Sequence, residues 1–198
     1  MNPGIEIVNV LDPKCQELEV LGYVVIGESW GAHLKLTDPL DLSLFSGKIS
    51  KLESEGFRLE VLELGQADLV LELELTTNDD YPYTPATSHL LPTLESTRSL
   101  WDLGHWVYGA FKYDALVGVG ATSRKRNETS IDFGSVRKEY RGLGVGSAIA
   151  SLAISRHVNL GERFFSTGGA AINEASQATV RSLGFVIDEQ WRSYERLN

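Results

Sequence analysis

Apolar residues follow two different spacings along the chain, and these spacings predict strands and helices. Alternation of apolar and polar residues, or a short apolar run between turn residues, predicts extended segments. These are residues 5–10, 23–36, 57–64, 106–111, 115–123, 129–136, 162–167, 185–188 and 192–196. Apolar residues three and four positions apart predict helices. These are residues 12–20, 40–55, 89–103, 144–159 and 173–182. Strands that alternate with helices are typical of an α/β fold.

The connections between these segments predict a mixed sheet. Residues 106–111 and 115–123 form a hairpin, and a turn at 125–128 leads into 129–136, so these strands should be antiparallel neighbours. A helix joins residues 129–136 to 162–167. Strands connected in this way run parallel through a right-handed crossover. We therefore expect a largely antiparallel sheet that contains one parallel pair.

A glycine-rich stretch, Arg141-Gly142-Leu143-Gly144-Val145-Gly146-Ser147, lies between the strand at 129–136 and the helix after it. The first N–H groups of a helix lack partners within the helix and carry the positive end of its dipole. Glycines let a phosphate approach such a backbone closely. The stretch lacks the Gly-Lys-Ser/Thr sequence of a Walker-type loop. It also lies far from the chain start, and residues 163–167 end without the acidic residue of a dinucleotide site. A pyrophosphate site of another kind is indicated.

Two motifs resemble those of a known family. The sequence Val136-x-x-x-Tyr140-Arg141-x-x-Gly144-x-Gly146 resembles the coenzyme A loop of GNAT superfamily N-acetyltransferases, whose signature is Arg/Gln-x-x-Gly-x-Gly/Ala. Downstream, Asn173-x-x-Ser176 and then Leu183-Gly184-Phe185 resemble the family's Asn-x-x-Ala/Ser motif and its Leu-Gly-Phe. The resemblance covers residues 57–196. It implies an acetyltransferase-like fold, with helices on both faces of the sheet and a coenzyme A cleft between two splayed parallel strands.

The resemblance also implies how acetyl-CoA binds. Backbone amides of residues 143–147 would hold the pyrophosphate, Arg141 would add charge beside it, and main-chain groups near Val136 and Lys138 would pair with pantetheine. Asn173 would hydrogen-bond the pantetheine arm or cap the helix that follows it. The predicted coenzyme-binding residues are Val136, Lys138, Arg141, Gly142, Leu143, Gly144, Val145, Gly146, Ser147 and Asn173.

The catalytic residues are less well defined by the resemblance. Many family members have a tyrosine that protonates the leaving thiolate at the position of Val180, and valine has no proton to donate. Ser176, Tyr140, another hydroxyl or a water takes this role, or the thiolate leaves unassisted, or the protein has lost its activity. Asp132 is the first candidate for the general base, with a structural carboxylate as its alternative, and Asp80 is the second candidate.

The acceptor side is expected between residues 68 and 103. The leucines of residues 68–75 alternate as in a strand, although leucine and glutamate favour helices. The family commonly has a helix there, followed by a loop ending Asp-x-Pro, so we predict a helix. The matching Asp80-Tyr81-Pro82 and the nearby Tyr83 make Asp80, Tyr81 and Tyr83 candidate substrate-binding residues; the two tyrosines have loop packing as their alternative role.

The first 56 residues form a predicted N-terminal extension of the acetyltransferase domain at residues 57–198. Residues 21–30 resemble residues 183–191 with one residue inserted, since both begin Leu-Gly-aromatic and end in tryptophan. The segment is interpreted either as a degenerate half-copy of a tandem domain or as a chance similarity.

Composition narrows the setting and the partners. The 198 residues carry a formal charge of −9, which disfavours nucleic acid and anionic membranes and favours a cationic acceptor. Most of the acidic residues, Glu60, Glu72 and Glu74 among them, are expected on the solvated surface. The chain has one cysteine, no apolar run of membrane-spanning length and no signal pattern, so we expect a cytoplasmic protein, monomeric or homodimeric. Neither Cys15 nor the four histidines have metal-ligand spacing, which predicts no metal, and the histidines have no catalytic neighbours in sequence.

The leading function is acetyl-CoA-dependent N-acetylation of a small-molecule amine. The alternative from another class is a non-catalytic acyl-CoA-binding module, which Val180 and the undefined base would suit. A third interpretation keeps the enzyme and makes a protein N-terminus or lysine the acceptor. The C-terminal strands were expected at an exposed edge of the sheet, where another chain could pair.

Overall fold

The computed structural model of the chain describes residues 4–82, 84–87, 91–126 and 128–196. One eight-stranded sheet runs through them in the order β1-β8-β2-β7-β6-β5-β4-β3. All neighbours are antiparallel except β6 and β7, which are parallel, so the expected mixed sheet is confirmed. The strands are β1 Ile5–Asn9, β2 Tyr23–Lys35, β3 Phe57–Leu62, β4 Trp106–Lys112, β5 Ala115–Lys125, β6 Glu128–Val136, β7 Phe164–Ala170 and β8 Val186–Arg196.

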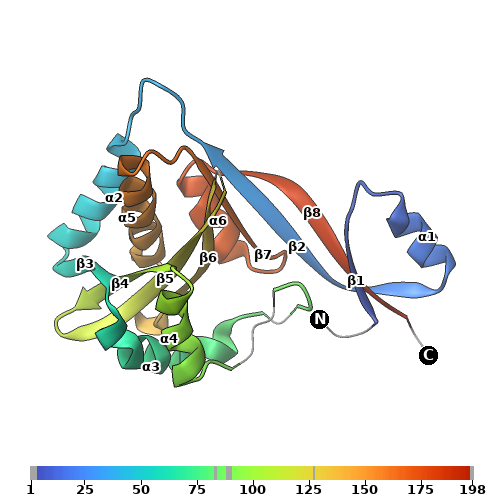
Figure 1. Cartoon of the computed structure of the whole chain (residues 1–198), viewed down its shortest axis with the longest axis horizontal. Helices are drawn as coiled ribbons and strands as arrows, with labels where there is room; N and C mark the ends of the chain where they lie inside the picture. Colours follow the sequence, from blue (N-terminus) through green and yellow to red (C-terminus); the bar gives the residue numbers. More distant parts are fainter. Residues whose placement is uncertain (1–3, 83, 88–90, 127, 197–198) are drawn as a thin grey trace.

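Helices cover both faces of the sheet (Figure 1). Helices α2 and α5 pack against each other on one face, and α3 and α4 lie together on the other face. The helices are α1 Lys14–Val20, α2 Ser43–Ser54, α3 Ala67–Thr77, α4 Leu94–Asp102, α5 Val145–Asn159 and α6 Glu174–Ser182. Short 3-10 helices occupy η1 Leu64–Gln66, η2 Asn78–Asp80 and η3 Lys138–Tyr140. The acetyltransferase-like architecture expected from the motifs is therefore present.

Residues 68–75, where strand and helix patterns conflicted, are helical as predicted. Val70 and Leu73 of α3 are completely buried against Val107 and Val119 of the sheet. The predicted helix at 89–103 begins later, at Leu94. Thr93 caps it, because its side chain accepts a hydrogen bond from the N–H of Ser96, while His89 lies outside the described residues.

Two glycines of β5 bring α5 close to the sheet. A Cβ atom at Gly118 would lie 2.7 Å from Val145 Cγ1, and one at Gly120 would lie 3.0 Å from Ile149 Cγ2. Real Cβ atoms essentially never approach as closely as at Gly118, and a Cβ atom at Gly120 would require Ile149 to shift by a few tenths of an ångström. The start of α5 is thereby held against the sheet beside β6.

The parallel strands separate soon after they meet. Their paired positions in the described structure are Thr129 with Phe165 and Ser130 with Ser166. Beyond Ser130, Thr167 Oγ1 of β7 still donates to the carbonyl of Ile131 at 3.0 Å, and the rest of β6 has no described backbone pairing on the side that faces away from β5. This is the splayed pair that the motifs implied.

The closing strands differ from the prediction. Residues 186–196 form the single strand β8, not two short strands, and β2 lies between β8 and β7. β2 itself is bulged, with a register shift between Val25 and Gly27. The expectation of an exposed C-terminal edge is wrong, because β1 pairs with the other side of β8. The edge was not predicted correctly because the two strands that flank β8, β1 and β2, come from the opposite end of the chain.

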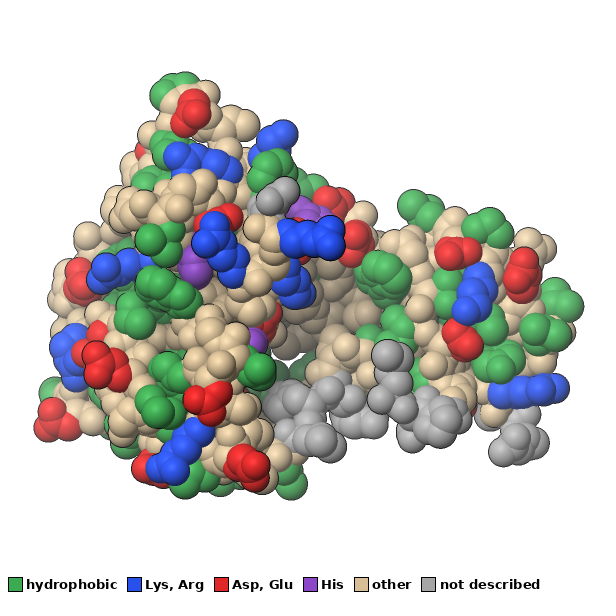
Figure 2. Space-filling model, viewed as in Figure 1, with side chains coloured by type: hydrophobic (Ala, Val, Ile, Leu, Met, Phe, Trp, Pro, Cys, Tyr) green, Lys and Arg blue, Asp and Glu red, His purple; other side chains and the backbone are tan. Residues whose placement is uncertain are grey.

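The predicted boundary at residue 57 does not coincide with a break in the sheet. β2 contributes Trp30, Ala32 and Leu34 to the same buried cluster as Phe165 of β7 and Phe185. β1 and α1 form a smaller cluster at the end of the long β2–β8 ribbon, away from the main body (Figure 1). Exposed hydrophobic side chains are frequent over this end (Figure 2). Whether residues 1–56 descend from a half-repeat stays a prediction.

Candidate functional site

The glycine-rich stretch forms the turn from β6 into α5. Gly142 and Gly144 have φ angles of +77° and +87°, in the left-handed region that glycine adopts without strain. The first hydrogen bond of α5 runs from the N–H of Ala148 to the carbonyl of Gly144, at 2.9 Å. The N–H groups of Val145 to Ser147 therefore have no partner within the helix, which suits the binding of an anion.

A cavity of about 580 Å³ extends from this turn along the open side of β6 towards α6. It brings together most of the predicted coenzyme residues. Those that line it are Val136, Arg141, Gly142, Gly144, Val145, Gly146, Ser147 and Asn173. Lys138 and Leu143 do not line it, and both are exposed.

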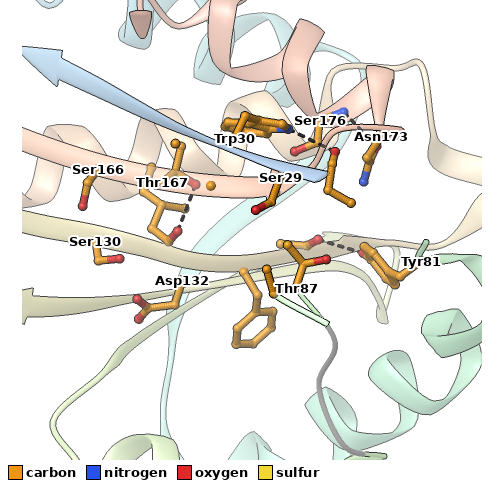
Figure 3. A pocket seen from close by; sticks show the side chains of 18 of the residues that line it. Ser29, Trp30, Tyr81, Thr87, Ser130, Asp132, Ser166, Thr167, Asn173 and Ser176 are labelled. Atoms are coloured by element: carbon orange, nitrogen blue, oxygen red, sulfur yellow. Dashed lines mark hydrogen bonds between the residues drawn. The ribbon is translucent and has the colours of Figure 1, made fainter. Parts of the chain in front are cut away.

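A larger cavity of about 930 Å³ opens on the other side of the splayed strands. Figure 3 shows Ser130 and Asp132 of β6 along one wall and Ser166 and Thr167 of β7 along the other. Both cavities are lined by Tyr81, Ile131, Asp132, Phe133, Gly134, Thr167, Gly168, Asn173 and Ser176. The two cavities therefore meet where β6 and β7 diverge, and a bound molecule in one would contact a molecule in the other.

Arg141 connects the coenzyme loop to the loop after α3. Its Nε–H donates to the carbonyl of Val136 at 2.9 Å, and its guanidinium donates to the carboxylate of Asp80 at 2.6 Å. Asp80 lines the smaller cavity, on the coenzyme side, and does not line the larger one. Its position therefore differs from the acceptor-side position implied by the resemblance.

Tyr81 lies at the junction of the two cavities (Figure 3). Its hydroxyl donates to the carbonyl of Gly134 at 2.7 Å and lies 2.7 Å from Ser135 Oγ. Burial raises the pKa of Tyr81, so the hydroxyl keeps its proton at neutral pH. Tyr83, the other tyrosine predicted to bind substrate, lies outside the described residues.

Asp132, the first candidate for the base, is held by two neighbours. Its carboxylate accepts a hydrogen bond from Ser123 Oγ at 2.9 Å and lies 3.3 Å from His105 Nδ1. His105 is therefore a neighbour of the first candidate base in space, although the two residues are far apart in sequence. These contacts fit the alternative role of Asp132 as a structural carboxylate. The residue also lines both cavities.

Glu74 is a candidate that the sequence analysis assigned to the solvated surface. It lies on α3 and lines the larger cavity, and burial raises the pKa of its carboxyl to about 7. Helical spacing could have identified it, because Glu74 is four residues after Val70 and three before Thr77, and both are buried. Glu72, which was assigned in the same way, is exposed and pairs with Arg137.

Helix α6 forms the far wall of the smaller cavity. The amide oxygen of Asn173 accepts from the N–H of Ser176 at 3.0 Å, so Asn173 caps the helix. Its amide nitrogen is then the group that can face a ligand. Val180 is 8% exposed and packs with Leu183. Position 180, where the resemblance implies a tyrosine in many members, is thus occupied here by a buried apolar residue.

Tyr140 belongs to the wall of the smaller cavity as well. Its ring packs against Phe57 in a perpendicular arrangement, with centroids 5.9 Å apart.

Among the described residues, no group of three or more His, Cys, Asp or Glu side chains could hold a metal ion, and no helix is long and apolar enough to cross a membrane. The predicted absence of a metal stays a prediction.

The sequence profile of the Acetyltransferase (GNAT) family matches residues 70–185, which is more than half of the chain. The chain belongs to this family. The match includes the loop from β6 into α5, the diverging strands β6 and β7, and Glu74. A search of curated proteins finds no match.

Solved GNAT structures share the fold over almost the whole chain. A GCN5-related N-acetyltransferase from Sphaerobacter thermophilus matches with a TM-score of 0.75 at 15% identity, over 97% of this chain and 58% of its own. A tandem GNAT protein of clavulanic acid biosynthesis matches with a TM-score of 0.64 at 18% identity, over 96% of this chain and 63% of its own. This GNAT chain therefore spans about six tenths of the length of these two relatives.

A third structure matches a smaller part of the chain. An aminoglycoside acetyltransferase from an uncultured soil sample has a TM-score of 0.53 at 13% identity, over 64% of this chain and 86% of its own. Identities this low show a common fold, and the acceptor of each relative is a property of that relative alone.

Proposed function

We propose that the protein transfers the acetyl group of acetyl-CoA to a primary amine of a small, cationic acceptor. The observation that carries this proposal is the meeting of two cavities at the divergence of β6 and β7. One begins at the unpaired N–H groups of α5, and the other is lined by carboxylates. Such an arrangement suits one ligand with a pyrophosphate and a second ligand with an ammonium group.

The smaller cavity fits coenzyme A. Its entrance supplies the N–H groups of Val145, Gly146 and Ser147, and left-handed Gly142 and Gly144 shape the turn that exposes them. A Cβ atom at Gly146 would meet only Val136 Cγ2, at 3.7 Å, so the turn has room near its backbone. These residues would hold the pyrophosphate, and the open side of β6 would pair with pantetheine as an added strand does.

The larger cavity fits a cationic amine. Its titratable lining among the described residues contains four carboxylates, the ammonium of Lys125 and the imidazole of His33, which contacts Asp188 outside the cavity. The carboxylates are those of Glu74, Glu128, Asp132 and Glu189. Trp191 also lines the cavity and can contact the body of the acceptor. Aminoglycosides belong among the acceptors to test, because one structural relative is an aminoglycoside acetyltransferase.

Glu74 is the best-placed general base. An alkyl ammonium must lose a proton before its nitrogen can attack the thioester carbonyl, and a carboxyl with a pKa of about 7 is substantially ionised at neutral pH. Glu74 would accept that proton, the amine would form the new C–N bond, and the C–S bond would break. Asp132 is less suitable because Ser123 and His105 already engage its oxygens.

The departing thiolate has a weaker donor than in many relatives. Val180 cannot donate a proton, whereas Ser176 lines both cavities and carries a hydroxyl. Protonation by Ser176 or by water is consistent with this wall. The lack of a proton donor at Val180 also supports the second candidate function, a non-catalytic acyl-CoA-binding module. Release of thiol with any amine acceptor would exclude that module.

Calorimetric titration with acetyl-CoA tests the proposal, with Gly146→Glu and Gly146→Ala as a matched pair. A glutamate in the first turn of α5 is compatible with the helix dipole, but it would place a negative charge where the pyrophosphate binds. We expect binding to weaken on the order of a hundredfold in Gly146→Glu, since juxtaposed like charges cost several kcal/mol. Gly146→Ala should bind like wild type, because the added Cβ meets only an ordinary contact.

A positive result justifies a screen of polyamines, aminoglycosides, amino acids and peptides for thiol release. Failure of the wild-type protein to bind acetyl-CoA would overturn the proposed function. Equal loss in both variants would place the effect in the backbone of the turn and would leave the anion site unsupported.

A further inference from the structure

The open side of β6 exposes two backbone carbonyls to the gap between β6 and β7. In the antiparallel pairing of β5 with β6, Val136 lies opposite Gly118, and the N–H of Arg137 donates to the carbonyl of Val117. Hydrogen-bonding groups alternate in direction along a strand. The backbone N–H and C=O groups of residues 135 and 137 therefore point to β5, and those of Gly134 and Val136 point into the gap.

Side chains already occupy both of these carbonyls. The Tyr81 hydroxyl donates to Gly134 O at 2.7 Å, and the Arg141 Nε–H donates to Val136 O at 2.9 Å. Asp80 holds the same guanidinium through its carboxylate at 2.6 Å. Tyr81 thus contacts a β6 carbonyl of the coenzyme groove directly, and the preceding residue, Asp80, contacts the groove through Arg141.

An arriving coenzyme would need the same groups. An extended amide chain that pairs with β6 uses the carbonyls and N–H groups of Gly134 and Val136, and a pyrophosphate attracts the Arg141 guanidinium. Arg141 cannot keep its present bonds to Val136 and Asp80 and also turn fully towards a pyrophosphate. The contacts seen in the structure therefore compete with the coenzyme.

We propose that Asp80 and Tyr81 are positioning residues that occupy the hydrogen-bonding groups of the coenzyme groove and are displaced when coenzyme A binds. This inference rests on the proposed function, since it requires the groove to bind coenzyme A. The free energy of the displaced contacts is subtracted from that of coenzyme binding, so these two residues weaken the binding of coenzyme A.

Displacement also reaches the acceptor cavity. Tyr81 lines both cavities, and Pro82, the next residue, lines the larger one. Release of this loop changes the wall against which the acceptor binds. Because coupling between two sites is reciprocal, an acceptor that prefers the released loop would in turn strengthen coenzyme binding.

The test compares Asp80→Asn with Asp79→Asn by calorimetric titration with coenzyme A. Asp79 lies on the same 3-10 helix and is exposed, and its recorded side-chain contact is with Asn78, so its substitution removes a nearby charge without touching Arg141. We expect Asp80→Asn to bind coenzyme A about two- to fivefold more tightly than wild type, as expected for loss of a partly exposed ion pair. Asp79→Asn should show a smaller change.

A second ligand separates the two contacts. The nucleotide half of coenzyme A carries the pyrophosphate and lacks pantetheine, so it competes with Asp80 for Arg141 and does not compete with Tyr81 for Gly134. Tyr81→Phe should therefore tighten the binding of coenzyme A and leave the nucleotide half unchanged. Asp80→Asn should tighten the binding of both.

Hydrogen exchange provides a readout of the loop itself. In the wild-type protein, coenzyme A should speed the exchange of backbone amides in residues 78–81. Equal affinities of wild type and Asp80→Asn, or equal gains in Asp80→Asn and Asp79→Asn, would overturn the inference and leave the proposed function intact. Absence of coenzyme binding by the wild-type protein would overturn both.

Discussion

Substitution of Glu74 by glutamine will lower kcat by about 10²- to 10⁴-fold, the range that a positioned general base contributes. Glutamine keeps the size of the side chain and cannot accept the proton of the acceptor ammonium. In the wild-type protein, kcat/KM should fall as the pH drops below about 7, because the carboxyl then becomes protonated. The variant should lose this limb of the profile. Steady-state kinetics between pH 5 and pH 9 provide the measurement.

Glu72→Gln is the matched control for this substitution. Glu72 lies two residues earlier on α3, is exposed and pairs with Arg137, so its substitution should leave kcat within about twofold. An unchanged pH profile and unchanged kcat in Glu74→Gln would contradict the assignment. Asp132→Asn would then become the variant to examine, because Asp132 lines both cavities.

Stability gives a test of Glu74 that needs no acceptor. Burial raises the pKa of this carboxyl from 4.5 to about 7, so the folded protein binds the proton more tightly than the unfolded chain does. The free energy of unfolding should therefore fall as the pH rises from about 4.5 through 7. Glu74→Gln avoids this loss and should be more stable than wild type at pH 8 by about 1–3 kcal/mol, as measured by denaturant unfolding. A variant that is more stable and less active fits a catalytic role better than a structural one.

Local patterns were sufficient to predict the turn from β6 into α5. The alternating residues of β6, the glycines after Arg141 and the helical spacing of α5 are adjacent in sequence, so the turn and its direction follow from short-range preferences. At residues 68–75 the local patterns conflicted, and the resemblance to the family was needed to predict the helix correctly. A helix puts Val70, Leu73 and Thr77 on one buried face, which an alternating strand would have divided between two faces.

Contacts between distant segments were not predictable in the same way. The bond from Arg141 to Asp80 joins residues whose separate motifs gave each a different role. Glu74 was assigned to the surface because a glutamate between leucines is usually solvated, whereas its environment depends on how α3 packs over β6. The position of β2 required the pairing of the first 35 residues with the last strand, and no local spacing encodes such a pairing.

Removal of residues 1–36 will leave a chain that shows no cooperative unfolding transition. β2 lies between β7 and β8, and without it both neighbours lose the backbone partners along one side. The deletion also removes buried Trp30, whose indole N–H donates to the carbonyl of Ala170 at 3.1 Å. Loss of a single buried tryptophan side chain costs about 3–5 kcal/mol, a large fraction of the stability of an ordinary domain. Circular dichroism during thermal unfolding is the measurement.

Removal of residues 1–22 is the control, since it deletes only the edge strand β1 and the helix α1. These elements pack through the separate cluster of Val8, Cys15, Leu18 and Tyr194, so the shorter protein should still unfold cooperatively, at a lower temperature. Cooperative unfolding of residues 37–198 with a native-like spectrum would contradict the prediction and would show that the proposed domain at 57–198 needs no N-terminal strand. The predicted difference between the two deletions instead makes β2 a part of the acetyltransferase domain. Its residues Ser29, Trp30 and Gly31 then form a wall of the larger cavity that the matched family region, residues 70–185, does not supply.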